Sequence, residues 1–156
     1  MAINTTINLL QAVNRGVPGV KRAPVLDKYP TQLNTADLPF AISWPADGTW
    51  HHEGMGGALK REDRTYRILV YTEPLGQNDI PTRAAAAAVL LQRFKETYLD
   101  PATVALADPS GSNPYQVTVE EGAQSPHSDG GLVSNLVFGG VPFHGFELRV
   151  RVRELW

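Results

Sequence analysis

The sequence predicts an α+β fold in which a single mixed, mostly antiparallel sheet is packed by an N-terminal helix and one long central helix. Two patterns carry this prediction: an alanine-rich stretch with helical spacing at residues 80–98, and strict apolar–polar alternation at residues 146–153. The 156 residues fit one domain spanning 1–156. The 14 glycines and 12 prolines predict many turns and long ordered loops.

The first element is expected to be a helix, because Ile3, Ile7 and Leu10 recur at helical spacing. Gly16 should end it, since glycine continues a helix poorly. Residues 17–38 then form an extended connection that is interrupted by prolines and has no clear period. Structureless connections of about 20 residues are uncommon unless they serve a function.

Two strands are expected after this connection. The first is marked by alternating large apolar residues, Phe40, Ile42 and Trp44. Pro45 should end it, and the glycine-containing residues 46–61 are expected to form a loop. The second strand should run from about Arg64 to Thr72. Because its apolar residues occupy both parities, it is expected to be central and covered on both faces.

Residues 80–98 are predicted to form the long central helix. Asp79 suits an N-cap, Pro81 suits the first turn, and the alanine run has the highest helical propensity. The apolar side chains form one stripe that should pack on the sheet: Ala87, Leu90, Leu91, Phe94 and Tyr98.

Three further strands complete the predicted order of helix, two strands, helix and three strands. In the first, apolar and polar residues alternate from Tyr115 to Val119. The second lies within Leu132–Phe138. Gly139-Gly140 signals a tight turn into the last strand. That strand should place Phe146, Leu148, Val150 and Val152 inward, and Glu147, Arg149, Arg151 and Arg153 outward.

The composition excludes several functional classes. The chain has no cysteine, which rules out disulfide frameworks, thiolate zinc sites and thiol nucleophiles. Its 14 basic and 16 acidic side chains give a net charge of −2, which excludes a nucleic-acid coat held by bulk charge. The apolar run Ala84–Leu91 is too short to span a membrane, and the N-terminus lacks the basic start of a signal peptide. A soluble chain of cytoplasmic origin, without a membrane partner, is therefore expected.

Charge is segregated along the chain. Residues 99–131 carry five acidic side chains and no lysine or arginine, whereas residues 60–67 carry four basic side chains and two acidic ones. One interpretation is ordinary solvated surface. The other is a head-to-tail contact, in which the acidic region of one subunit meets the basic strands of the next and the contacts close into a ring. The candidate interface or lumen residues are Arg149, Arg151, Arg153, Glu120, Glu121 and Asp129.

The arginine row on the last strand leaves two interpretations open. Exposed arginines on a strand can deter edge-to-edge aggregation. Alternatively, the row is an interface or lumen face that meets carboxylates or passing phosphates, with the weak affinity of one copy multiplied around a ring.

Candidate catalytic or metal-binding residues are few. A metal-dependent hydrolase would have to use His51, His52, His127 and Asp129. His51 and His52 are adjacent, and adjacent residues on a strand point to opposite faces, whereas zinc needs three or four ligands at fixed positions. No serine nucleophile motif is present. We therefore expect no catalytic residue, metal or cofactor, with the hydrolase kept as an alternative.

The chain resembles the tail terminators of long-tailed bacteriophages in its length, in the order of its elements and in several segments. The similar segments are Asn34-Thr35-Ala36-Asp37-Leu38-Pro39 before a strand that ends in Trp44-Pro45, Gly76-Gln77-Asn78-Asp79-Ile80-Pro81-Thr82-Arg83 before the central helix, and Gly145-Phe146-Glu147-Leu148-Arg149-Val150-Arg151-Val152-Arg153-Glu154 at the end. The resemblance spans nearly the whole chain.

This resemblance implies a non-enzymatic structural subunit of a homohexameric ring in the virion, located at the neck of the tail and assembled in the bacterial host cytoplasm. Such a ring caps the tail tube protein, stops its polymerisation and joins it to the head-side connector or stopper protein. DNA would pass through its lumen. The family has no catalytic residues to transfer to this chain.

Three alternatives to a tail terminator remain. The chain could be another neck or tail component, either a head-closure protein or a tail tube subunit, and a tube subunit would form long polymers. It could be the metal-dependent hydrolase described above. It could also be a monomeric binding module, with Trp50 and Trp156 as aromatic anchors.

Overall fold

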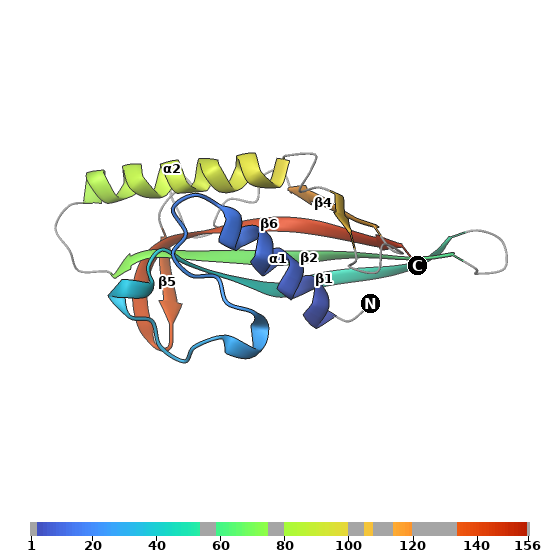
Figure 1. The fold of residues 1–156 in the computed structure, drawn as a ribbon, viewed down its shortest axis with the longest axis horizontal. Coiled ribbons are helices and arrows are strands. Elements are labelled where there is room, and N and C mark those ends of the chain that lie inside the picture. The colour runs from blue at the N-terminus through green and yellow to red at the C-terminus, as the bar shows by residue number, and fades with distance from the viewer. Residues whose placement is uncertain are drawn as a thin grey trace.

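One antiparallel sheet, with two helices packed against it, organises the fold (Figure 1). The computed structural model describes residues 3–53, 59–74, 80–99, 105–107, 114–119 and 134–155. The elements are α1 (Ile3–Gly16), β1 (Phe40–Glu53), β2 (Leu59–Pro74), α2 (Ile80–Leu99), β3 (Ala105–Ala107), β4 (Pro114–Val119), β5 (Ser134–Phe138) and β6 (Val141–Leu155), with 3-10 turns at Leu26–Lys28 and Thr35–Asp37. The predicted α+β class is confirmed.

The sheet has six strands, in the order β1-β2-β6-β4-β3, with β5 paired separately to β6. These strand pairs are antiparallel, and an isolated parallel bridge between Arg22 and Phe40 makes the sheet mixed. β2 lies between β1 and β6, which confirms its predicted central position. The prediction that both its faces are covered is wrong at Arg67, whose side chain is 39% exposed on the face opposite the helices. The strand β3 was not predicted. Its three residues are too few to show a sequence period.

Both helices pack on the same face of the sheet. Ile7 and Leu10 of α1 and Phe94 of α2 belong to one buried cluster with Ile68 of β2. The ring of Phe94 meets the ring of Phe146 edge-on, with 5.7 Å between centroids. Burying each such side chain stabilises the fold by about 1.5–3 kcal/mol. The predicted stripe of α2 is confirmed, because Ala87, Leu90, Leu91, Phe94 and Tyr98 are all buried. Among the residues described, neither helix combines the length and the apolar character needed to cross a membrane.

The first strand is longer than the sequence predicted, because Pro45 does not end it. β1 continues to Glu53 and pairs with the extended start of β2, so most of the predicted loop 46–61 is a hairpin. β1 is an edge strand, and its register shifts between Pro45 and Gly48. A proline at such a position removes no hydrogen bond from the ladder, which is why the strand tolerates it.

The outer edge of β1 is closed over its first half by the N-terminal region. The Ala41 N–H donates to the carbonyl oxygen of Arg22 at 3.0 Å, and Gln11 Nε2 donates to the carbonyl oxygen of Ala41, also at 3.0 Å. The Ser43 N–H donates to the Tyr29 hydroxyl at 3.1 Å, and that hydroxyl donates to the Ser43 carbonyl at 2.8 Å. Pro45, two residues after Ser43, has no N–H to offer at this edge. This half of the edge therefore offers little to an added strand.

A buried polar network joins this edge to both helices. Asn14 Nδ2 donates to Gln11 Oε1 at 2.8 Å and to Ser43 Oγ at 3.0 Å, and the Tyr98 hydroxyl donates to Asn14 Oδ1 at 2.6 Å. Gln11, Asn14, Ser43 and Tyr98 are all 0% exposed, and burial raises the pKa of Tyr98 well above its ordinary value. The network fixes α1 relative to α2 and β1, because losing one partner would leave desolvated polar atoms.

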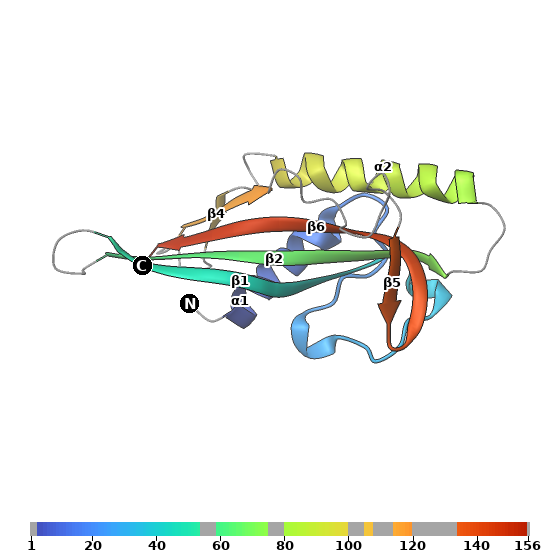
Figure 2. The same ribbon diagram turned by 180° about the vertical axis from the view of Figure 1, so that it is seen from behind.

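A second apolar cluster lies on the opposite face, at one end of the sheet. Gly139 and Gly140 have φ angles of 57° and 81°, which confirms the predicted tight turn from β5 into β6. β6 then passes Gly145, where the carbonyl oxygen of Val70 leaves no room for a Cβ. Figure 2 shows β5 crossing this end of the sheet. The cluster consists of Leu38, Phe40, Ile42, Tyr71, Leu136 and Phe143.

Candidate functional site

The sheet face opposite the helices carries a group of arginines on β2 and β6. This face is turned toward the viewer in Figure 2, where α1 lies behind the strands. Strand register places Arg67 beside Arg149, Thr65 beside Arg151, and Asp63 beside Arg153. Because side chains alternate along a strand, these residues lie on the face opposite the one that holds Ile68 and Leu148. We call the following set the arginine face: Trp44, Asp63, Arg67, Glu147, Arg149, Arg151 and Arg153.

Glu147 lies between two arginines of this face. The sequence predicted it to be outward, and the structure corrects this, since the residue shares the arginine face but is only 3% exposed. It accepts hydrogen bonds from Arg67 Nε at 2.5 Å, from Arg67 Nη2 at 3.3 Å and from Arg149 Nε at 3.4 Å. The physical reason is electrostatic: arginines directly opposite one another repel, and a carboxylate between them removes that repulsion. The hydrogen bond to Glu147 raises the pKa of Arg67 above its ordinary value, against the opposing effect of partial burial.

The carboxylates of the arginine face form ion pairs with its arginines. Asp63 forms an ion pair with Arg153, with 2.9 Å between Oδ1 and Nε, and Glu147 serves both Arg67 and Arg149. Among the described side chains, the face thus contains four arginines and two carboxylates. The side chains of Arg67, Arg149 and Arg153 are 39%, 41% and 42% exposed to solvent. Arg151 is exposed as well. Such guanidinium groups suit carboxylate or phosphate partners.

Trp44 adds a large apolar side chain to the arginine face. The residue is 49% exposed. Ala41 and Ser43 take the helix-covered face of β1, so Trp44 shares the other face with Phe40, beyond the reach of the cluster that buries Phe40. It stands opposite Arg67 in the register. An exposed tryptophan among arginines is typical of protein–protein contact sites.

The structure brings together only part of the predicted interface set. Arg149, Arg151 and Arg153 lie on one face, as expected. The acidic members, Glu120, Glu121 and Asp129, lie outside the described residues.

The residues assigned to a metal-dependent hydrolase are not brought together in the described part. His127 and Asp129 lie outside it, and His51 and His52 belong to β1 with undescribed side chains. Where side chains are described, no group of three potential metal ligands occurs. Of the proposed aromatic anchors, Trp50 belongs to β1 with an undescribed side chain, and Trp156 lies outside the described residues.

Sequence reasoning missed three members of the arginine face: Trp44, Asp63 and Arg67. The alternation of β6 identified its own arginines, but Arg67 and Asp63 join them only through the pairing of β2 with β6. A signal was present only in part: Thr65 and Arg67 alternate with the apolar Tyr66 and Ile68, but the charged Arg64 interrupts the pattern beside Asp63.

No protein-family model matches the chain, and no curated protein matches its sequence. A functional proposal therefore depends on the residues themselves.

Proposed function

We propose that the chain is a structural virion protein, a tail terminator subunit that assembles with copies of itself into a ring. The observation that carries the proposal is the arginine face, which combines an exposed tryptophan and four arginines on a sheet face that neither described helix covers. A surface of this composition favours contact with another protein.

The acidic part of the same chain supports a second copy as that protein. Residues 99–131 contain five acidic side chains and no basic ones, so each copy carries both a basic face and an acidic segment. A contact between unlike surfaces of identical chains is heterologous, and heterologous contacts close into rings when the rotation permits. Opposite charges across the contact would set its register.

The first half of the β1 edge is closed, which favours a terminator over a tail tube subunit. A tube that grows by pairing sheet edges needs free backbone donors and acceptors along an edge strand. In β1 the outward groups of Ala41 and Ser43 are already bonded to Arg22, Gln11 and Tyr29. Contacts through side chains on a face fit this arrangement better and need not propagate.

In the proposed role the ring has six copies and sits at the neck of the tail, in a virion assembled in the bacterial cytoplasm. One side of the ring contacts the last layer of tail tube protein and ends its polymerisation. The other side receives the head-side connector or stopper protein. DNA passes through the lumen, and the role requires no catalysis and no cofactor.

Native mass spectrometry over a concentration series, followed by electron microscopy, tests this proposal. We expect one discrete metal-free oligomer of six copies, seen as single ring layers. Long polymers would support a tube subunit instead. A monomer with one zinc ion per chain would support the hydrolase, and a bare monomer at every concentration would contradict self-assembly.

A further inference from the structure

A cavity of about 580 Å³ lies between α2, the end of β2 and two stretches of the connection after α1. It is separate from the arginine face, since its walls come from residues 19–21, 35–39, 72–74 and 86–93. Cavities that bind small ligands or peptide side chains usually measure 300–1,000 Å³. The volume is therefore sufficient for a ligand with several carbon atoms.

The inner wall of the cavity is apolar. Leu38, Ala87 and Leu90 line it, although their side chains are 5%, 1% and 5% exposed. The surfaces that they present are continuous with the two hydrophobic clusters, so the wall is held rigidly by the core. A ligand that covers this wall would bury an aliphatic group, at about 25 cal/mol for each Å² removed from water.

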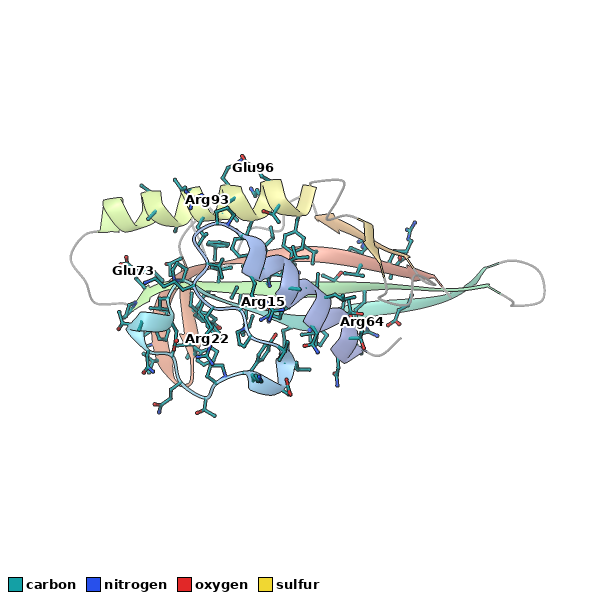
Figure 3. All side chains as sticks on the ribbon, viewed as in Figure 1. Arg15, Arg22, Arg64, Glu73, Arg93 and Glu96 are labelled. Carbon is teal, nitrogen blue, oxygen red and sulfur yellow. The ribbon has the colours of Figure 1, made fainter. Side chains whose placement is uncertain are left out.

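The charged residues of the lining are two cations, Lys21 and Arg93, and one carboxylate, Glu73. Figure 3 shows Arg93 on α2 and Glu73 near the end of β2. Both cations are exposed. Glu73 has an interaction within the chain, but its Oε2 atom is buried and accepts no hydrogen bond in the described part of the molecule. In the described part of the molecule, the Lys21 ammonium takes part in no ion pair. The polar part of the cavity thus carries one surplus positive charge.

Arg93 is fixed in place at the cavity. Its Nη1 donates to the carbonyl oxygen of Pro18 at 3.2 Å. Gly19 follows with a φ of 100°, and a Cβ there would approach the same Nη1 atom to 3.0 Å. The guanidinium therefore lies against the backbone of the connection, with its other donors available to a ligand.

We propose that this cavity binds a carboxylate that carries an aliphatic chain of leucine size or larger. The apolar wall receives the chain, and Lys21 and Arg93 receive the carboxylate. Two sources share this chemistry: an acidic, leucine-containing segment of a partner protein, or a free aliphatic acid. The site does not depend on ring assembly, so its failure and the failure of the proposed function are distinguishable.

Isothermal titration calorimetry with defined probes tests the site on the full chain. The probes are octanoate, its uncharged counterpart 1-octanol, and the blocked dipeptide N-acetyl-Leu-Glu-amide. We expect at least one carboxylate probe to bind with one-to-one stoichiometry, and octanoate, where it binds, to do so about tenfold more tightly than 1-octanol. Binding of the dipeptide identifies a protein segment as the source, and binding of octanoate alone identifies a free acid.

Two matched substitutions on α2 locate the binding. Ala86 lines the cavity and Ala85 does not, yet both side chains are exposed and lie on the same helix. Ala86→Phe should fill the cavity and weaken the carboxylate probe by about tenfold or more, whereas Ala85→Phe should leave affinity within about twofold. Lys21→Gln should reduce the preference for octanoate over 1-octanol. The proposal is overturned if no carboxylate probe binds, if 1-octanol binds as tightly, or if Ala86→Phe binds like the wild type.

Discussion

The two faces of the sheet are made by alternate residues of the same strands. Ile68 and Leu148 are 0% and 1% exposed under the helices, whereas their neighbours Arg67 and Arg149 keep 39% and 41% of their side-chain exposure. The helix-covered face gains stability by excluding water, and the arginine face holds charge that other molecules can reach. The difference teaches that stability and recognition can be altered separately, one residue apart.

The largest effect should come from the helix-covered face. Phe94→Ala removes a ring that is 0% exposed and packed against Phe146, so we expect unfolding to become easier by about 3–5 kcal/mol. Urea denaturation measures this change. Val89→Ala is the control on the same helix, because Val89 is 53% exposed and its loss should cost less than about 0.5 kcal/mol. Equal costs for the two variants would refute the assignment of faces.

The polar network beneath the helices should give the next largest effect. Asn14→Ala removes the partner of Tyr98, Gln11 and Ser43 while all three remain buried. We expect a loss of about 2 kcal/mol in unfolding free energy, because the buried Tyr98 hydroxyl would keep only a 3.5 Å contact with the Leu10 carbonyl, although Ser43 Oγ still donates to Gln11 Oε1. Chemical denaturation provides the test, and a loss below about 0.5 kcal/mol would mean that the network contributes little.

A smaller loss is expected on the arginine face, where water remains close. Glu147→Gln removes the charge that Arg67 and Arg149 share, although both arginines can be partly resolvated. Breaking a fully buried pair costs about 3–5 kcal/mol. Here Glu147 is buried but both arginines reach water, so we expect a loss of about 1–2 kcal/mol. Denaturation at low and at high salt measures it. A cost that matched Phe94→Ala would show that this face is part of the core.

Sequence patterns revealed most of the fold because they depend on local periodicity. The stripe of α2 and the alternation of β6 both follow from residues close together in the chain. Pro45 misled the prediction, since only the sheet order shows that β1 is an edge strand and can tolerate proline.

The candidate site was harder to predict than the fold, because it is assembled from different strands. Arg67 joins Arg149 only through strand pairing, and Glu147 looked like an outward carboxylate until its two arginine partners were known. The exposure of Trp44 depends on where the cluster that covers Phe40 ends. These are tertiary facts that no short window of sequence contains.

The last effect is a pH dependence that is absent at neutral pH and appears only above pH 10. Burial raises the pKa of Tyr71 to about 12, against the opposing charge of Arg67. Above pH 10 the hydroxyl of Tyr71 loses its proton in the unfolded chain but keeps it in the folded chain. Its contribution to the free energy of unfolding is therefore fully present below pH 10 and is lost as the pH rises toward 12. Tyr71→Phe should therefore lose stability less steeply than the wild type between pH 10 and 12. Thermal unfolding across this range tests it, and parallel curves would contradict the assignment.

Sedimentation velocity of two charge-reversal variants tests the central claim most directly, namely that the arginine face joins subunits. Arg151→Glu reverses an exposed charge on that face, and Arg15→Glu reverses an exposed charge on α1. We predict that Arg151→Glu weakens self-association by about tenfold or more, because like charges would then meet, while Arg15→Glu assembles like the wild type. Both monomers should keep their stability within about 0.5 kcal/mol. Unchanged assembly of Arg151→Glu, or a wild type that stays monomeric at every concentration, would contradict the account.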